Sequence, residues 1–467
     1  MKITASDITA ATGGRLASGP PATPITGVST DSRTLASGDA FFALVGERFD
    51  GHQFLRQAAE AGAAAVVISD GAAAGRLTEF PCAVIIVADT LRALGDLAAS
   101  YRRTLDCAVV AITGSCGKTS VKEMLGQVLE TRFKGHRPES SFNNFVGVPL
   151  TIFRSEPGDD YLILELGTNA PGEMRRLAGI AQPTIAVVTC VAPTHLEGLG
   201  SLEGVAQEKE ELVRVLGEDG LAVLNADDPR VAGMADVAKA PVRTFGATDG
   251  DVLAEAIAAD ARSVSFTLDS TVKVRLPVPG RHNVLNALAA VTVAREMGLD
   301  DETIAAALAR YRPPKMRLVR EELPDGLTLI DDAYNANLAS CLAALDVLCL
   351  QAATGRYVLV QGDMLELGRQ SKAMHEQLGR AIADSCVDLL VTVGAETQAT
   401  SLEAAAKSGS VRLHFRDSRA AAEEVVSLVG PGDVVLVKGS RGMALEHVVT
   451  AIRKHFGGGV AMARPSA

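Results

Sequence analysis

The sequence predicts an α/β protein built from three domains, and three observations support this prediction. The chain has 467 residues, whereas a single hydrophobic core stops growing near roughly 250–300 residues. From residue 107 onward, apolar runs of strand length alternate with helical segments, a pattern typical of parallel sheets covered on both faces. The pair Pro313-Pro314 cannot continue a helix and is the best candidate linker. We therefore expect domains at residues 1–104, 105–313 and 314–467.

The first predicted domain is a small α/β unit. Short β-rich pieces, such as residues 82–87, occur together with Ala-rich helical pieces, such as residues 54–62. Its unusual feature is a pair of polar segments, residues 29–33 and 46–52. Considered alone, these two segments are typical of solvated turns.

The two larger domains are predicted to contain parallel sheets. In the central domain, a β-rich stretch near residues 264–278 precedes a helix that begins after Pro279-Gly280. The third domain repeats the alternation of strands and helices, which predicts a doubly wound, Rossmann-like sheet. The expected strands are residues 107–113, 162–167, 185–191 and 221–227 in the central domain, and residues 327–331, 357–362, 389–394, 411–415 and 434–439 in the third.

The acidic charge balance argues against a nucleic-acid-binding protein. The chain carries 45 Lys and Arg residues against 56 Asp and Glu residues, a formal net charge of −11. No run of Lys or Arg is long enough to follow a phosphate backbone. We expect neither nucleic-acid binding nor general binding to anionic membranes, although a local basic site for one small anion is compatible with this charge.

Cysteine usage and the lack of long apolar segments predict a soluble cytoplasmic protein. The seven cysteines are scattered and form no Cys-x-x-Cys pair, so we expect them to be reduced thiols. The amino terminus lacks the apolar core of a signal peptide. No apolar stretch approaches the roughly 18–20 residues of a membrane helix. We expect no membrane insertion and a monomeric protein.

The sharpest local signal is a glycine-rich loop between a predicted strand and a predicted helix, the context that a phosphate-binding loop (P-loop) requires. Glycines let the backbone amides turn inward, and the helix amino terminus adds positive potential. Lys118 can then neutralise the terminal phosphates of ATP, and the Thr119 hydroxyl can ligate Mg²⁺. The alternative is a glycine-rich turn that happens to carry a lysine. The expected phosphate-binding residues are Gly114, Ser115, Cys116, Gly117, Lys118, Thr119 and Ser120.

The form of this loop resembles that of a known family. It is shorter than the usual Walker A loop, because Ile112 occupies the earlier glycine position. The pattern Thr-Gly-x-x-Gly-Lys-Thr resembles the loop of the Mur ligase and folylpolyglutamate synthase superfamily. Further family-like pieces occur in order along nearly the whole chain: Asn143-Asn144 with Gly147-Val148-Pro149, Glu165-Leu166-Gly167, His195-Leu196-Glu197, Lys209, Gly280-Arg281-His282-Asn283 through Asn286, and Tyr334-Asn335-Ala336-Asn337.

The resemblance implies an ATP-dependent ligase that activates a carboxylate as an acyl phosphate and then joins it to an amine. The two amino-terminal polar segments, with residues 362–364 and 438–441, look like the branch that adds D-alanyl-D-alanine to UDP-N-acetylmuramoyl-tripeptide. The main alternative is the branch that adds a diamino acid to UDP-N-acetylmuramoyl-dipeptide, although the third domain lacks that branch's Asp-Asn-Pro-Arg segment. A nucleotide-gated binding module without chemistry is a further alternative. The candidate UDP-sugar-binding residues are Ser29, Thr30, Asp31, Arg33, Gly46 and His52.

The resemblance also implies an ATP site shared by the two larger domains. Asn283 and Asn286 are three residues apart near a helix start, so both amides can face one planar base edge. Family members bind adenine there. Arg317 matches an arginine that reaches the phosphates, and Asp332 matches a residue that contacts ribose. A site drawn from two domains implies closure before chemistry.

The remaining candidates are expected around the metal ions and the reacting phosphate. Glu165 ends a strand and can reach a Mg²⁺ ion held by Thr119, although it could instead cap a helix. His195 follows the next strand and should lie on the same rim as a metal ligand, unless it is structural. Lys209 lies in an acidic stretch typical of a solvated face, but the resemblance implies a carbamylated lysine that supports a second Mg²⁺. Asn144 matches a position beside the reacting phosphate or is a turn asparagine. The candidate catalytic residues are Lys118, Asn144, His195, Lys209 and Arg317.

Overall fold

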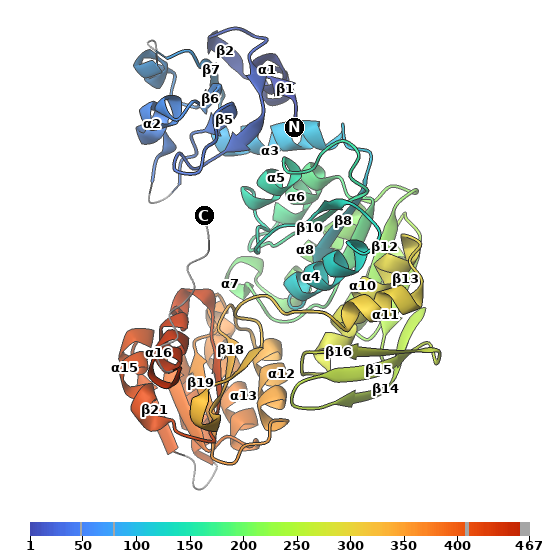
Figure 1. Cartoon of the computed structure of the whole chain (residues 1–467), viewed down its shortest axis with the longest axis vertical. Coiled ribbons are helices and arrows are strands. Elements are labelled where there is room, and N and C mark those ends of the chain that lie inside the picture. The colour runs from blue at the N-terminus through green and yellow to red at the C-terminus, as the bar shows by residue number, and fades with distance from the viewer. Residues whose placement is uncertain (47–48, 78–79, 407–410, 458–467) are drawn as a thin grey trace.

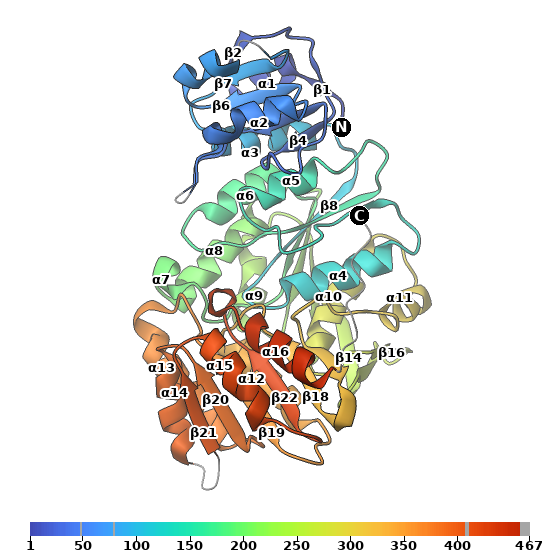
Figure 2. The ribbon, with the colours of Figure 1, turned by 60° about the vertical axis from the view of Figure 1, so that its left-hand side comes forward.

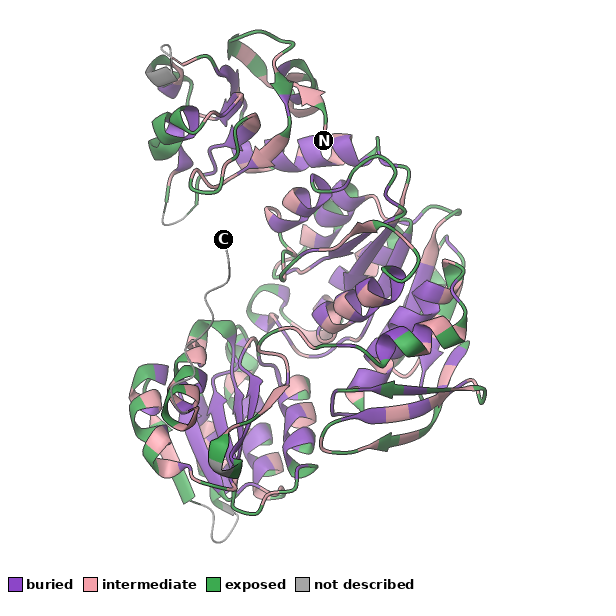
Figure 3. Cartoon of the chain, in the orientation of Figure 1, coloured by how far each residue is buried: buried purple, intermediate pink, exposed green. Residues whose placement is uncertain are grey.

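The chain folds into three α/β parts that follow one another from the amino to the carboxyl end (Figure 1). The computed structural model describes residues 1–46, 49–77, 80–406 and 411–457. Each part has its own larger sheet, whose strands supply much of the buried core (Figure 3). The α/β class is thereby confirmed, while the boundaries placed at residues 104 and 313 stay a prediction. Within the described residues, no helix has both the length and the apolar character needed to cross a bilayer.

The first part is a five-stranded sheet in the order β2-β7-β6-β5-β4, parallel except for the pairing of β2 with β7. Helix α3 connects it to the central part. The Tyr101 hydroxyl on α3 donates to the Ser155 carbonyl at 2.7 Å, and Arg102 donates to the Ala181 carbonyl at 3.2 Å. The elements are β1 (Ile3–Thr4), α1 (Ala5–Thr12), β2 (Arg15–Ser18), β3 (Pro24–Ile25), β4 (Gly27–Ser29), β5 (Asp39–Phe42), α2 (Leu55–Glu60), β6 (Ala65–Ile68), β7 (Ala83–Ile86) and α3 (Thr90–Arg102).

The central part is a nine-stranded sheet in the order β16-β15-β14-β13-β12-β11-β8-β10-β9. It is parallel from β9 to β14 and antiparallel from β14 to β16. Helices α4, α10 and α11 pack together on one face, and α5, α6 and α8 cover the other. Its strands are β8 (Ala108–Thr113), β9 (Gly135–His136), β10 (Tyr161–Glu165), β11 (Ile185–Val188), β12 (Leu221–Asn225), β13 (Val242–Gly246), β14 (Val252–Ala259), β15 (Val264–Leu268) and β16 (Val272–Leu276). Its helices are α4 (Lys118–Leu129), α5 (Gly147–Ile152), α6 (Glu173–Ala181), α7 (Leu196–Leu199), α8 (Leu202–Arg214), α9 (Pro229–Ala232), α10 (His282–Glu296) and α11 (Asp301–Leu308).

The third part is a six-stranded sheet in the order β17-β18-β22-β19-β20-β21, parallel except for β17. Figure 2 shows this part, orange to red, packed directly beneath the central part. Helices α12 and α13 cover one face of the sheet, and α15 and α16 cover the other. The elements are β17 (Val319–Glu322), β18 (Thr328–Asp332), α12 (Leu338–Cys349), β19 (Tyr357–Gly362), α13 (Ser371–Ala383), β20 (Leu389–Val393), α14 (Thr397–Glu403), β21 (Val411–Phe415), α15 (Ser418–Leu428), β22 (Val434–Lys438) and α16 (Glu446–Phe456).

The expected strands are present, but strands β9, β13, β14 and β17 of the two larger sheets were not predicted, and two predicted regions differ from the structure. The strand expected at residues 185–191 ends at Val188, because Thr189 leaves the sheet and donates from its hydroxyl to the Cys116 carbonyl. The single β-rich stretch near residues 264–278 is in fact two antiparallel strands, β15 and β16. The preceding strand β14 was not predicted.

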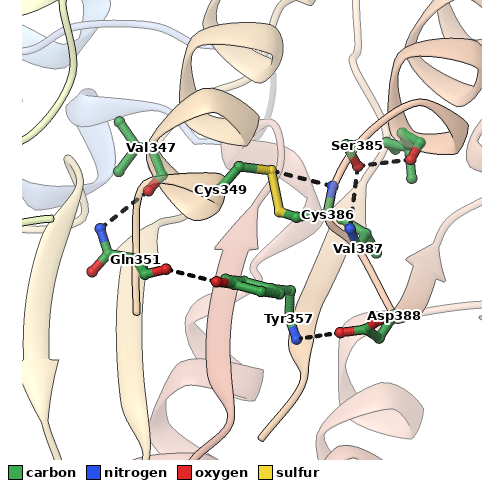
Figure 4. Close-up of a disulfide and its surroundings, with 9 residues drawn as sticks. Val347, Cys349, Gln351, Tyr357, Ser385, Cys386, Val387 and Asp388 are labelled. Atoms are coloured by element: carbon green, nitrogen blue, oxygen red, sulfur yellow. Dashed lines mark hydrogen bonds between the residues drawn. A yellow bond between two sulfur atoms is a disulfide. The ribbon is translucent and has the colours of Figure 1, made fainter. Parts of the chain in front are cut away.

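The prediction of seven reduced cysteines is wrong for two of them. Cys349, at the end of α12, and Cys386, just before β20, form a disulfide with their Cα atoms 5.6 Å apart (Figure 4). They are 37 residues apart in sequence and meet because α12 packs against α13. Sequence spacing gave no sign of this tertiary contact. The other five cysteines are free.

Candidate active site

The phosphate-binding loop lies between β8 and α4, as predicted. Gly114 and Gly117 have φ angles of 147° and 84°, which L-residues with a side chain rarely adopt. A Cβ atom at Gly117 would also lie 2.3 Å from the Asn286 Oδ1 atom. The Lys118 Nζ atom donates to the Gly114 carbonyl at 2.6 Å, so it closes over the loop where phosphates would sit. The loop therefore has the backbone conformation and the cation that phosphate binding requires.

Glu165 and Thr119 meet beside this loop. Strand β10 pairs in parallel with β8, which places Glu165 opposite Ile112 at the carboxyl end of the sheet. The buried carboxylate accepts from the Thr119 hydroxyl at 2.9 Å and from the Asn143 side-chain amide at 3.0 Å. Asn143 was part of the recognised motif but was not predicted as a site residue. The signal that could have found it is its direct neighbour in sequence, Asn144.

These two oxygen ligands suit Mg²⁺. This ion usually binds through one or two carboxylates together with substrate phosphates, not through a complete protein cage. Within the described ranges, no group of three or more His, Cys, Asp and Glu residues could hold a metal by itself. The Thr119 hydroxyl and the Glu165 carboxylate, beside a phosphate loop, fit an ion that shares its coordination with a nucleotide.

His195 connects the central and third parts. It precedes α7 with a φ angle of 52°, and its Nδ1 atom contacts the Glu366 carboxylate. The Glu197 backbone N–H also donates to the Glu366 carbonyl at 3.1 Å. The hydrogen bond from His195 lowers the pKa of Glu366. His195 thus lies on the predicted rim, but its contact with Glu366 could not be predicted without the arrangement of the two parts.

Lys209 is not on a solvated face, so that alternative is wrong. Its side chain on α8 is buried, with 2% of its surface exposed. The pKa of Lys209 is lowered to about 7, mainly by burial and to a smaller extent by the nearby positive charge of Lys118. The solvated ion pairs of this stretch belong instead to Glu210 and Glu211, which pair with arginines. Lys209 therefore lies inside the protein, and its lowered pKa makes the neutral amine accessible at physiological pH.

A cavity of about 270 Å³ extends from the loop between the central and third parts. Asn283 and Asn286 on α10 line it, and the Asn286 amide donates to Asn283 Oδ1 at 3.1 Å. The predicted pair of amides therefore faces one space. Asp332 lines the same cavity and accepts from Lys438 Nζ at 2.6 Å. Lys438 belonged to a recognised segment, but its ion pair with Asp332 was not predicted.

A second, more polar cavity of about 340 Å³ lies on the other side of the loop. Lys118, Asn144, Glu165, His195 and Arg317 are among the residues that line it. The Asn144 side-chain oxygen accepts from the backbone N–H of two residues at the start of α5, as a turn asparagine does. The five side chains nevertheless converge on one space.

Arg317 brings the third part to the phosphate loop. Its guanidinium donates to the Thr119 hydroxyl at 3.1 Å and lies 4.2 Å from the centre of the Tyr334 ring. Asn337, at the start of α12, contacts the Cys116 thiol at 3.2 Å. Two residues of the third part therefore touch the loop directly.

The amino-terminal candidates lie in the first part and not among the residues lining the two cavities. Asp31 and Arg33 form an exposed ion pair at 2.6 Å, and this hydrogen bond lowers the pKa of Asp31 to about 2. His52 is buried, with Nδ1 at 2.7 Å from Asp50 and Nε2 accepting from the Ser69 N–H at 3.1 Å. Ser29 donates to the Asp31 carbonyl, Thr30 lies between them, and the Gly46 N–H donates to the Phe49 carbonyl. Glu47 and Arg48 of the second segment lie outside the described residues. A UDP-sugar site here stays a prediction.

Comparisons with known proteins match nearly the whole chain. Three family models match: "Mur ligase family, catalytic domain" at residues 24–102, "Mur ligase middle domain" at 112–294 and "Mur ligase, glutamate ligase domain" at 316–441. The UDP-N-acetylmuramoyl-tripeptide--D-alanyl-D-alanine ligase of Escherichia coli is 39% identical over 92% of this chain and 94% of that protein. A crystal structure of MurF from Acinetobacter baumannii has a TM-score of 0.88 and 34% identity, and the match covers 97% of this chain and 99% of that one. MurF ligase from Thermotoga maritima in complex with ADP has a TM-score of 0.80 and 27% identity, with 92% and 98% coverage. The chain belongs to the Mur ligase family.

Proposed function

We propose that this protein is an ATP-dependent, ADP-forming ligase that joins D-alanyl-D-alanine to UDP-N-acetylmuramoyl-tripeptide. The product is UDP-N-acetylmuramoyl-pentapeptide, a precursor for peptidoglycan synthesis. The observation that carries the proposal is similarity over nearly the whole chain to relatives that bear this activity in their names. The geometry of the phosphate loop supports the ATP-dependent part independently, because two parts of the chain supply cations to one phosphate site.

The chemistry begins with the tripeptide carboxylate. One of its oxygens attacks the γ-phosphorus of ATP, the bond to the β–γ bridging oxygen breaks, and ADP leaves. Lys118 and Arg317 are placed to stabilise charge on the transferred group, in the manner of other phosphoryl-transfer sites. Mg²⁺ held by Thr119 and Glu165 would supply further charge stabilisation at the same phosphates.

The second step joins the amine. The amino group of D-alanyl-D-alanine attacks the acyl carbon, phosphate leaves with the bonding electron pair, and the amine loses a proton. The polar cavity around Asn144 and His195 is the space that supports this step. Residues of the third part also line this cavity and contact the central part, so closure of the two parts around bound substrates would help to keep water from the acyl phosphate.

We also propose that Lys209 reacts with carbon dioxide to form a carbamate. A carbamate forms when a neutral amine attacks carbon dioxide and loses a proton. Burial lowers the pKa of Lys209 to about 7, which favours the neutral amine at physiological pH. The resulting negative group would lie near Lys118 and could support a second Mg²⁺.

Phosphate release from ATP tests the proposed function. Purified protein is given ATP and Mg²⁺ with either UDP-N-acetylmuramoyl-tripeptide plus D-alanyl-D-alanine, or UDP-N-acetylmuramoyl-dipeptide plus lysine or diaminopimelate. We expect turnover only with the first pair, and none when either member of that pair is omitted. Turnover with the dipeptide and a diamino acid would assign the protein to the alternative branch. Lys118→Ala is the negative control for phosphate release, because it removes only the amine of Lys118 from the phosphate loop.

A further inference from the structure

Two cysteines meet inside the phosphate site, and their thiol groups have no role in the ligase chemistry above. Cys116 is the third residue of the loop sequence Gly-Ser-Cys-Gly, and Cys190 follows β11. The Cys116 N–H donates to the Cys190 Sγ atom at 3.3 Å, and the Cys190 thiol donates to the Cys116 carbonyl at 3.8 Å. Their backbones are held in place by a further bond, from the Ser115 N–H to the Cys190 carbonyl at 2.9 Å. The Cys190 sulfur therefore lies against the backbone of Cys116, between two fixed segments.

The pair is accessible from the ATP site. Cys116 and Cys190 are both partly exposed, and both line the 270 Å³ cavity. Cys116 also lines the 340 Å³ cavity. A small oxidant that enters either cavity can therefore reach the Cys116 sulfur, with Cys190 next to it.

The two thiols differ in how easily they ionise. The hydrogen bond from Cys190 lowers the pKa of Cys116 to about 6, helped by Asn337 and by the charges of Lys118 and Lys438. The same hydrogen bond, together with burial, raises the pKa of Cys190. A thiolate beside a protonated thiol is the arrangement of a reactive cysteine with its resolving partner. By contrast, burial raises the pKa of the other free cysteines, Cys82, Cys107 and Cys341.

We propose that Cys116 and Cys190 form a peroxide-sensitive modification site that closes to a disulfide and reversibly inactivates the ATP site. In the first step the Cys116 sulfur attacks one oxygen of a hydroperoxide, the O–O bond breaks, and a sulfenic acid and water (or an alcohol) are formed. In the second step Cys190 loses its proton and attacks that sulfur, a second water leaves, and the S–S bond forms. The two thiols lose two electrons, which reduce the peroxide.

The disulfide would disturb the loop in two ways. The sulfur atoms must approach to about 2.05 Å, which pulls the loop toward β11. The Cys116 sulfur would also turn away from Asn337, whose amide now contacts it at 3.2 Å and connects the third part to the loop. A displacement of about 1 Å in a catalytic site can lower the rate about a hundredfold. Oxidation should therefore inactivate the enzyme without unfolding it.

The test is peroxide treatment of the full-length protein, followed by catalase, alkylation of free thiols and digestion without reduction. Mass spectrometry should find a peptide that links Cys116 to Cys190. ATP turnover should fall about a hundredfold, and the amount of linked peptide should increase in proportion to this loss. Dithiothreitol should restore turnover. The native Cys349–Cys386 link provides an internal standard for an intact disulfide. Only the turnover readout rests on the proposed function, since the linked peptide is detected by mass alone.

Two variants make the test specific. In Cys190→Ser, no resolving thiol is present, so Cys116 should proceed to the sulfinic acid and the lost turnover should not return with dithiothreitol. Cys107→Ser, which removes a thiol elsewhere in the central part, should behave like the wild type. Each variant is compared with its own untreated state. Absence of the Cys116–Cys190 peptide from inactivated wild type, or full recovery of Cys190→Ser, would overturn the proposal.

Discussion

Replacement of Lys209 by Met should separate stability from activity. Lys209 is buried and its pKa is lowered to about 7, whereas the ordinary value is 10.5. At pH 8 the unfolded chain carries a protonated amine that the folded chain must release. The gap of about 2.5 pH units, at about 1.4 kcal/mol each, amounts to about 3 kcal/mol against the folded state. Met has a similar shape and no charge, so Lys209→Met should stabilise the region by up to that amount.

The sign of the pH dependence follows from the lowered pKa. In carbon-dioxide-free buffer, the wild type should lose stability as the pH falls from 10.5 toward 7, and the loss should level off below 7. Lys209→Met should lack this dependence. Formation of a carbamate in bicarbonate buffer would bind carbon dioxide to the folded wild type only, which offsets part of this cost and should reduce the difference between the two proteins.

Hydrogen–deuterium exchange of peptides from α8 (Leu202–Arg214) provides the measurement, because it reports local opening in a protein of several parts. Lys122→Met is the matched control. Lys122 is equally buried, but it donates to the carbonyls of Pro138 and Ser140, so its loss should destabilise the protein.

Activity completes this test. If a carbamate at Lys209 supports a metal ion, Lys209→Met and Lys209→Ala should be nearly inactive. Acetate or formate should partly restore Lys209→Ala by occupying the vacated space, and should not restore Lys118→Ala. Full activity of either Lys209 variant, or destabilisation of Lys209→Met like that of Lys122→Met, would refute the reasoning.

Three further predictions concern the loop, its partner from the third part and the disulfide. Lys118→Ala should lower ATP turnover at least about a hundredfold with an unchanged circular dichroism spectrum, since its amine serves the phosphates; near-normal turnover would count against the loop assignment. Arg317→Lys keeps the charge but loses the flat contact with Tyr334, so kcat should fall about tenfold or more, and a variant equal to wild type would argue against closure by this residue. Replacing Cys349 and Cys386 together with Ser should lower the free energy of unfolding of the third part by up to about 4 kcal/mol for a loop of 37 residues, measured by urea unfolding; an unchanged midpoint would contradict this role.

Local patterns were sufficient for most of the fold. Strands such as β19 and β22 each begin with four consecutive apolar residues, so their positions could be predicted closely. Strand β14 was missed because Val-Leu-Ala-Glu-Ala-Ile-Ala-Ala is rich in good helix formers. It is a strand because β13 and β15 offer backbone partners on both sides, and tertiary pairing overrides local propensity.

The site was predicted in its parts but not in its assembly. The phosphate loop and Glu165 follow from strand order, because parallel strands bring their carboxyl ends to one rim. The contacts of His195 with Glu366 and of Cys116 with Asn337 depend on how two sheets meet, which no local pattern encodes. The burial of Lys209, by contrast, could have been predicted from the sequence.

The sequence signal for the burial of Lys209 is the spacing of apolar residues along α8. Lys209 is four residues after Val205 and three before Leu212, and these two apolar residues are buried on the core face of the helix. Helical periodicity therefore places Lys209 on the same face. The neighbouring glutamates at positions 210 and 211 gave the opposite impression because they are only partly buried and pair with arginines.

The transfer of labelled oxygen tests whether the site activates a carboxylate by phosphorylating it. UDP-N-acetylmuramoyl-tripeptide carrying ¹⁸O in its terminal carboxylate is incubated with the protein, ATP, Mg²⁺ and D-alanyl-D-alanine. We expect each phosphate released to contain one ¹⁸O atom, because the attacking carboxylate oxygen leaves with phosphate when the amine attacks. Release of unlabelled phosphate alongside pentapeptide formation would contradict an acyl-phosphate intermediate and the phosphoryl-transfer role assigned to Lys118 and Arg317.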